Sequence, residues 1–213
     1  EIKYVLITDN GDWQKRDTII KSFGDATLQV SDDATNDNNW TGGWNLTSED
    51  YFSPNQSFTD SPNDDYLANS FETYTFNDTI DLTNAVSAAT RFQAKWDIEQ
   101  GWDYVQFQVS TDFGNSWIAQ CGKFTNPGVT NNGNSQPVGE PLYDGTQNDW
   151  VLEEISLSDY LGEKVMFRFV LVSDGFVHED GFYFDDFEIL FDMENDASLD
   201  ENNLSNFKLI PNP

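Results

Sequence analysis

Apolar and polar residues alternate with a period of two through the middle of the chain. Every second residue is apolar in 92–98 (FQAKWDI), and 105–109 (VQFQV) repeats the pattern. Residues 164–174 (KVMFRFVLVSD) and 182–191 (FYFDDFEILF) are similar, with less polar intervening positions. Because successive side chains of a β-strand point to opposite faces, the pattern predicts strands with one face on a core and the other in solvent.

Strand-like segments follow one another from about Thr27 to Asp192, joined by turns rich in Gly, Asn and Asp and by long loops. Only residues 156–163 (SLSDYLGE) suggest a helical turn, and residues 123–146, rich in Gly, Pro and Asn, are expected to form a surface loop. We therefore predict an all-β fold, a jelly-roll/β-sandwich of two antiparallel sheets, for residues 25–191.

The two ends of the chain follow different patterns. In residues 1–24, the β-like runs Tyr4–Thr8 and Asp17–Ser22 flank an Asn-Gly-Asp turn, which predicts a β-hairpin. This hairpin would be the tail of a preceding domain or a ribbon docked on the sandwich. Residues 192–206 are acidic and lack periodicity, as is typical of a linker.

Composition supports a packed core and restricts the partners. Aromatic residues make up 15% of the 213 residues, enough bulky side chain to fill a core. The formal net charge of −28 repels phosphates and anionic lipid, so we expect no nucleic-acid partner. No apolar run approaches the roughly 20 residues that span a bilayer, so we also expect no membrane insertion.

The residue types of common catalytic centres are scarce. His178 is the only histidine and Cys121 the only cysteine, so no internal disulfide can form. A zinc enzyme draws two or three ligands from these residue types, so we expect no zinc in this segment. A Ser-His-Asp triad would depend on His178 alone, which is more simply a solvated loop residue.

Paired carboxylates are a weaker catalytic signal. Glu99 with Asp103, and Glu179 with Asp180, are close enough in sequence to suggest a glycosidase pair. With 38 acidic residues in the chain, however, neighbours of this kind arise by chance and nothing selects one pair. We therefore expect this chain itself to be non-catalytic.

Residues 110–117 (STDFGNSW) match the S-x-D-x-G-x-x-W pattern called an Asp-box. The pattern predicts a hairpin turn in which Asp112 accepts hydrogen bonds from loop amides and Gly114 takes a positive φ. Trp117 would close the base of the turn. We assign the motif a structural role.

Two groups of aspartates are candidate calcium ligands. Residues 59–66 (TDSPNDDY) place Asp60, Asp64 and Asp65 on a Pro-containing turn, and Asp185 and Asp186 interrupt an apolar strand. By strict alternation, one of the latter two shares the core face, where a carboxylate needs a cation or hydrogen-bond donors. If the first and last strands are neighbours, this aspartate meets the 60–66 loop around one Ca²⁺. The alternative is an aspartate satisfied by loop amides.

The order of motifs from Trp40 to Phe191 resembles the MAM-like jelly-roll domains of secreted bacterial peptidases. The resemblance rests on residues 44–47 (WNLT), 59–66, 80–83 (IDLT), 92–117, 143–174 and 181–189 (GFYFDDFEI). It implies a non-catalytic accessory β-sandwich that commonly holds calcium. Carried over to this chain, it implies Asp60 and the Asp185/Asp186 pair as ligands, with Glu99 as a further candidate.

Both ends show further resemblances. Residues 206–213 (NFKLIPNP) are similar to the opening of the C-terminal sorting domain of type IX secretion, which implies that 207–213 begin such a domain. It also implies export across the outer membrane of a Bacteroidetes-type bacterium, to the medium or the cell surface. Residues 17–24 (DTIIKSFG), leading through 40–62, resemble the junction downstream of the catalytic domain in secreted zinc carboxypeptidases. The catalytic domain would then lie upstream in the same polypeptide.

A binding module of a secreted adhesin is the alternative function, with a glycan or a matrix protein as ligand. Tryptophans exposed on a jelly roll stack on sugar rings. The candidates, chosen because polar residues or glycine flank them, are Trp13, Trp40, Trp44 and Trp102. The competing interpretation is that most of these tryptophans belong to the core.

Overall fold

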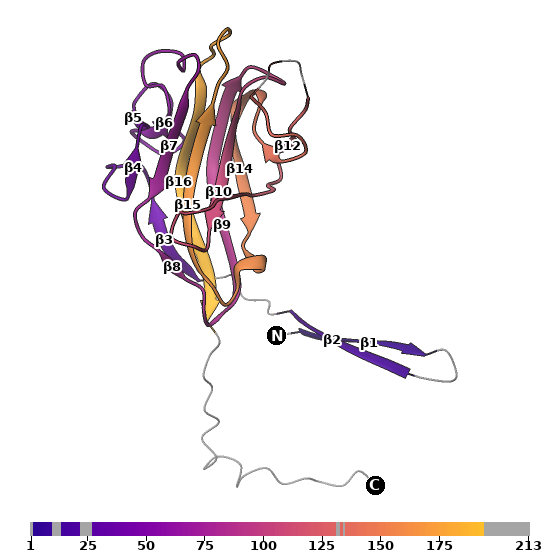
Figure 1. Cartoon of the computed structure of the whole chain (residues 1–213). Coiled ribbons are helices and arrows are strands. Elements are labelled where there is room, and N and C mark those ends of the chain that lie inside the picture. Colours follow the sequence, from indigo (N-terminus) through magenta and orange to yellow (C-terminus); the bar gives the residue numbers. More distant parts are fainter. Residues whose placement is uncertain (1, 10–13, 22–26, 131–132, 134, 194–213) are drawn as a thin grey trace, which may run out of the picture.

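The computed structural model describes residues 2–9, 14–21, 27–130, 133 and 135–193. Two antiparallel sheets pack face to face (Figure 1). The first has the order β11-β10-β15-β7-β4, with β8 also paired to β15; the second has the order β14-β9-β16-β6-β5, with β3 also paired to β16. This is the predicted all-β sandwich.

The strands of the first sheet are β4 (Trp40–Gly42), β7 (Phe71–Phe76), β8 (Ile80–Asp81), β10 (Tyr104–Ser110), β11 (Ile118–Ala119) and β15 (Lys164–Val172). Those of the second are β3 (Leu28–Asp32), β5 (Asn45–Thr47), β6 (Ser57–Thr59), β9 (Ala85–Ile98), β14 (Gly145–Ser156) and β16 (Gly181–Met193). The predicted helical turn is a short 3₁₀ helix, η1 (Ser158–Tyr160). The 123–146 segment carries a two-residue ribbon of β12 (Asn126–Pro127) and β13 (Pro141–Leu142).

Aromatic side chains fill the space between the sheets. Along β9 the buried positions alternate as the sequence predicts, with Phe92, Trp96 and Ile98 all facing the core. Across the sandwich, the rings of Phe169 and Phe184 stack with centroids 4.4 Å apart. Burial of so many large rings supplies the main driving force for folding despite the low mean hydropathy.

A β-bulge in β16 changes the expected position of Asp185 and Asp186. The register between β16 and β9 shifts between Asp185 and Glu188, and Asp186 adopts a φ of 48°. Asp185 pairs with the outward-facing Gln93, whereas the next core residue is Phe187. The prediction that one of the two aspartates shares the face of Phe187 is therefore wrong, because the extra residue of the bulge resets the alternation.

The predicted N-terminal hairpin is present as β1 (Ile2–Asp9) and β2 (Gln14–Lys21). The strands pair antiparallel, from Ile2 opposite Lys21 to Asp9 opposite Gln14. The turn, including Trp13, lies outside the described residues, as do the predicted linker after 193 and the sorting-domain start at 207–213.

The Asp-box forms the predicted turn between β10 and β11. Asp112 accepts hydrogen bonds from the Ser110 hydroxyl at 2.8 Å and from the Ser116 amide at 2.8 Å. Gly114 has a φ of 84°, and the Trp117 indole donates to its carbonyl at 3.1 Å. The hydrogen bonds that Asp112 accepts, first of all one from the Ser116 hydroxyl at 2.6 Å, lower the pKa of Asp112 to about 2. Asp112 thus serves a structural purpose here.

Among the described residues, no helix is long and apolar enough to cross a membrane.

Candidate functional site

Three carboxylates meet at one end of the sandwich. Glu99 follows β9, Asp103 precedes β10 and Asp174 follows β15. Because β10 pairs with β15 from Tyr104 opposite Val172 onward, the ends of these strands bring the three side chains together. One oxygen of each lies within 4.8 Å of the others, and in the part of the chain that the structure describes no other three acidic, histidine or cysteine side chains do so.

Asp103 is the fixed centre of this acidic cluster. Its side chain is fully buried, and it accepts hydrogen bonds from the Tyr66 hydroxyl at 2.9 Å and from the Asp174 amide at 2.6 Å. The same Tyr66 oxygen accepts a hydrogen bond from the Glu99 amide at 3.1 Å. Tyr66 thereby links the loop after β6 to the loop between β9 and β10. Glu99 Oε2 is buried, and none of the described residues makes a hydrogen bond to it.

Electrostatics make this cluster costly without a cation. Burial raises the pKa of Glu99, and the nearby charges of Asp103 and Asp174 raise it further. Burial also raises the pKa of Asp103, although the hydrogen bonds from Asp174 and Tyr66 oppose the effect. The ion pairs found within the described ranges join Arg91 to Glu188, Lys95 to Asp50 and Lys164 to Asp81.

The donor set fits a hard divalent cation. Ca²⁺ takes six to eight oxygen ligands, and the cluster supplies carboxylates from three chain segments. The buried, unpartnered Glu99 oxygen would gain a partner, and the unneutralised charge would be balanced. Thiolate or imidazole ligands, which would favour zinc, do not contribute to the cluster.

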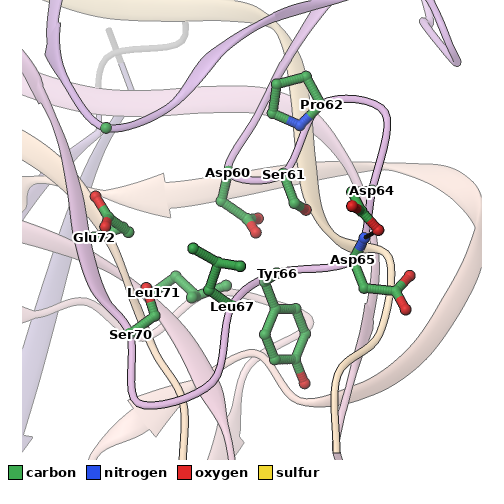
Figure 2. Close-up of a pocket in the computed structure, with 11 residues that line it drawn as sticks. Asp60, Ser61, Pro62, Asp64, Asp65, Tyr66, Leu67, Ser70, Glu72 and Leu171 are labelled. Atoms are coloured by element: carbon green, nitrogen blue, oxygen red, sulfur yellow. Dashed lines mark hydrogen bonds between the residues drawn. The ribbon is translucent and has the colours of Figure 1, made fainter.

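Asp60 lies in a separate pocket of about 420 Å³ (Figure 2). It follows β6, and because β6 pairs with β16, its Oδ1 accepts a hydrogen bond from the Phe182 amide at 2.7 Å. Its Oδ2 is buried without a partner. Burial raises the pKa of Asp60 to about 7.

The other two aspartates of the 59–66 turn do not join Asp60 in a close cluster. Asp64 and Asp65 are exposed, and Asp64 accepts a hydrogen bond from the Asp65 amide at 3.0 Å. Figure 2 shows the Asp65 carboxylate directed away from Asp60. The positive φ of 68° at Asn63 turns the chain outward here.

Asp185 follows the second alternative, an aspartate satisfied by amides. Its Oδ2 accepts hydrogen bonds from the Phe52 amide at 3.0 Å and the Ser53 amide at 2.8 Å. Its Oδ1 accepts one from the Asp186 amide at 2.8 Å. Asp185 therefore anchors the loop after β5 to the outer face of β16, and it does not meet Asp60.

Two of the four tryptophans predicted as glycan-stacking residues belong to the core. Trp40 and Trp44 are only 5% and 2% exposed, so neither offers a ring face to a ligand and that prediction is wrong for both. Trp40 stacks on Tyr74 with ring centroids 5.3 Å apart. Trp102 is half-buried and keeps partial access to solvent. The indoles were needed to fill the core, as the competing interpretation held.

A groove of about 330 Å³ on the outer face of β10 was not predicted from the sequence. Its lining consists of Tyr104, Gln106, Gln108, Trp117, Ile118, Ala119, Pro137 and Glu140. Gln108 accepts a hydrogen bond from Arg168 at 2.7 Å and donates to Gln106 at 2.8 Å. Arg168 also lies over the Trp117 ring, 4.4 Å from its centroid.

Sequence reasoning found one residue of the acidic cluster as a ligand and missed two. Glu99 was a candidate ligand, whereas Asp103 was considered only as its possible catalytic partner. The feature of the sequence that could have identified Asp103 as a further ligand was its short spacing from Glu99 across a turn. Asp174 carried no signal, because its place depends on the pairing of β10 with β15.

Comparisons with known proteins address the chain's family. No curated protein sequence matches it. The CBM22-1 xylan-binding domain of Paenibacillus barcinonensis Xyn10C shares 15% identity over 80% of this chain and 97% of that one, with a TM-score of 0.42. The K1 cleaved adhesin domain of Lys-gingipain from Porphyromonas gingivalis W83 shares 16% identity over 75% and 88%, with a TM-score of 0.38. Neither likeness is close enough to bear on function.

The family model for the MAM domain of immune inhibitor A-like proteins matches residues 56–209. The match begins one residue before β6 and takes in Asp60, the acidic cluster and the whole of β16. It spans well over half of the sequence and contains most of the strands of both sheets. The chain therefore belongs to the immune inhibitor A-like MAM domain family.

Proposed function

We propose that this chain is a non-catalytic accessory module of an exported peptidase and that Ca²⁺ holds it in shape. The observation that carries the proposal is the meeting of Glu99, Asp103 and Asp174 within 4.8 Å, with one buried oxygen unpartnered. A bound Ca²⁺ would balance this charge. It would also tie the loop between β9 and β10 to the end of β15, which pins the two sheets together at one end.

The three residues have distinct parts in this proposal. Asp103 is held in place by Tyr66 and by the Asp174 amide, so its orientation is set by the fold. Glu99 contributes the oxygen that lacks a partner. We favour this cluster over the 59–66 turn, because Asp64 and Asp65 are exposed and diverge from Asp60.

The surroundings of the acids support an accessory rather than a catalytic role. Glu99 and Asp103 do come together, but Asp103 is fully buried and engaged by two donors, so it has no access to a glycosidic bond. His178 and Cys121 are both exposed. Neither has the oriented partner that nucleophilic catalysis requires.

Calcium titration calorimetry of the chelator-treated chain tests the location of the site. We expect one binding event, weakened at least tenfold by Glu99→Gln. Asp65→Asn removes a formal charge of the same sign from an exposed position and should leave the affinity unchanged. Equal weakening by both variants would mean that Ca²⁺ senses only the net charge and would refute the site.

The parent protein is proposed to be a zinc carboxypeptidase exported by type IX secretion. Support comes from the resemblance of residues 17–24, leading through 40–62, to the junction segment and of residues 206–213 to the sorting segment. Sequencing the parent reading frame upstream of Glu1 tests it. An H-x-x-E motif with a later histidine in an α/β domain supports the proposal, whereas further β-sandwich modules alone would contradict it.

Glycan binding is the second candidate function, now at the groove on β10. Tyr104 and Trp117 offer aromatic surface there, and the hydrogen bonds of Gln106 and Gln108 fix the direction of their amides. Aromatic faces beside oriented amides are the combination that recognises sugar rings. Binding on a glycan array that is lost in Tyr104→Ala but kept in the exposed-surface control Phe176→Ala would support this function. No binding by the unmodified chain would exclude it.

A further inference from the structure

The Asp60 pocket is lined by acids and apolar side chains and by no basic residue. The acids are Asp60, Asp64, Asp65 and Glu72; the remaining lining is Gly43, Ser61, Pro62, Tyr66, Leu67, Ser70 and Leu171. Figure 2 shows the Asp60 carboxylate directed into the space above the Tyr66 ring, while the Tyr66 hydroxyl points away toward the acidic cluster. The pocket is thus distinct from the proposed calcium site, although Tyr66 borders both.

Asp60 Oδ2 marks where a ligand is missing. Among the described residues, no donor makes a hydrogen bond to this buried oxygen, because the adjacent Ser61 hydroxyl donates to the Asp180 carbonyl at 2.9 Å, while Oδ1 is held by the Phe182 amide. Buried polar atoms in folded proteins nearly always have partners, so an orphan acceptor facing a pocket calls for a donor. A carboxylate oxygen accepts only, and a cationic N–H donor is its strongest partner.

No lysine or arginine in the segments that the structure describes offers such a donor, and the ring of His178 lies beside that of Tyr66, with centroids 6.4 Å apart, where it acts on Asp103. Arg91, Lys95 and Lys164 are paired with other acids. Lys123 and Arg168 lie over the rings of Phe124 and Trp117. A cation for the pocket would therefore come from a second molecule.

We propose that this pocket receives the basic side chain of a peptide, lysine or arginine. Leu67, Leu171 and the Tyr66 ring would cover the methylene stem, and Asp60 and Glu72 would pair with the charged head. Gly43 makes room for Glu72, because a Cβ there would lie 2.0 Å from its Oε2. The volume of about 420 Å³ falls in the usual range of about 300–1,000 Å³ for ligand pockets.

An organic cation fits the pocket better than a metal ion. A metal needs several oxygens converging on one point, and the pocket acids contribute to no group of three within 4.8 Å among the described side chains. A lysine or arginine side chain instead spans a pocket with separated charges and apolar walls. The inference deepens the proposed function by naming what the module would engage, and it uses other carboxylates than the calcium site.

The test is a titration of the whole chain with three tripeptides, followed by amide chemical shifts. Ac-Gly-Lys-Gly-NH₂ and Ac-Gly-Arg-Gly-NH₂ carry the cation, and Ac-Gly-Gln-Gly-NH₂ is the neutral control. Saturating Ca²⁺ keeps the fold constant, and 0.15 M salt screens the general attraction of a −28 chain. We expect saturable shifts at Leu67, Ser70 and Phe182 with a basic peptide only.

Variants make the result specific to the pocket. Asp60→Asn should weaken binding at least tenfold and Glu72→Gln severalfold, and the second variant serves if the first does not fold. Asp159→Asn removes the same charge from an exposed position on η1 and should bind as the unmodified chain does. Any one of three results would overturn the proposal. They are unchanged binding in both pocket variants, equal binding of the glutamine peptide, and displacement of the basic peptide by millimolar Ca²⁺ that causes the same amide shifts. Calcium binding at Glu99 is measured separately and survives any of these results.

Discussion

At the scale of single residues, Asp60 should make stability depend on pH. Its pKa is about 7 in the folded chain against 3.8 for a free side chain. A carboxyl group whose pKa is higher in the folded than in the unfolded chain stabilises the fold fully at a pH below the unfolded-state pKa. This contribution is lost as the pH rises through about 7, the folded-state pKa. In metal-free protein, the stability of Asp60→Asn relative to the unmodified chain should therefore rise by about 3 kcal/mol between pH 5 and pH 8.

Urea unfolding of both proteins at pH 5 and pH 8 measures this difference. Asp159→Asn, an exposed acid, is the control and should show the same pH profile as the unmodified chain. Parallel profiles for Asp60→Asn and the unmodified chain would contradict the assignment of a raised pKa to Asp60.

Gly181 is needed where β16 begins beside Asp60. It has a φ of 92°, and an added Cβ would lie 2.5 Å from Ser61 Oγ and 2.6 Å from Asp60 Oδ2. Gly162 has the same φ of 92° but would meet nothing within 4 Å. Gly181→Ala should lower the free energy of unfolding by about 1–3 kcal/mol more than Gly162→Ala, because only the former adds a clash to the backbone strain. Equal losses in denaturant unfolding would show that the contact is not tight.

The sequence was a better guide to which side chains are unusual than to the role of each one. Asp60 was a candidate from its turn, yet whether its partner is an amide, a metal or an organic cation depends on Phe182 and Glu72, which are remote in sequence. Trp40 and Trp44 have polar residues or glycine as sequence neighbours, as exposed residues often do. The short strand β4 and the turn that follows it nevertheless direct both indoles into the core.

At the scale of elements, Asp185 tests whether a buried carboxylate is a ligand or an anchor. The amides of Phe52 and Ser53 attach their loop to Asp185 in β16, and the Asp186 amide of the same strand is its third backbone donor. Asp185→Ala leaves these donors unpaired and should lower the free energy of unfolding by about 1–3 kcal/mol. Calcium affinity, measured by calorimetry, should not change. A loss of affinity instead would make Asp185 a calcium ligand after all.

Period-two alternation predicted the long strand β9 well, since every second side chain is buried from Ala88 to Ile98. It failed at β16, where one bulge residue reverses the faces. A bulge depends on how the neighbouring strand is paired, so a single strand's sequence does not reveal it. The Asp-box was predictable because all its hydrogen bonds join residues within a few positions of each other.

At the scale of the whole molecule, the sandwich followed from composition and pattern, but the site did not. Many aromatic residues and regular alternation suffice to predict two packed sheets. The acidic cluster needs the end of β15 beside the start of β10, about seventy residues apart in sequence. The sequence predicted calcium from the aspartates of the 59–66 turn, from Asp185 and Asp186 and from the family resemblance, whereas the site now proposed shares only Glu99 with that set.

The most direct test of the account is thermal unfolding of the whole chain after chelation, without and with added Ca²⁺, for the unmodified protein and Glu99→Gln. At a concentration about a hundred times the dissociation constant, binding adds about 2.7 kcal/mol, which corresponds to a rise in Tm of roughly 5–10 °C. We predict that rise for the unmodified chain and little or none for Glu99→Gln. A Tm that does not respond to Ca²⁺ in the unmodified chain would contradict the proposal that the ion holds this module together.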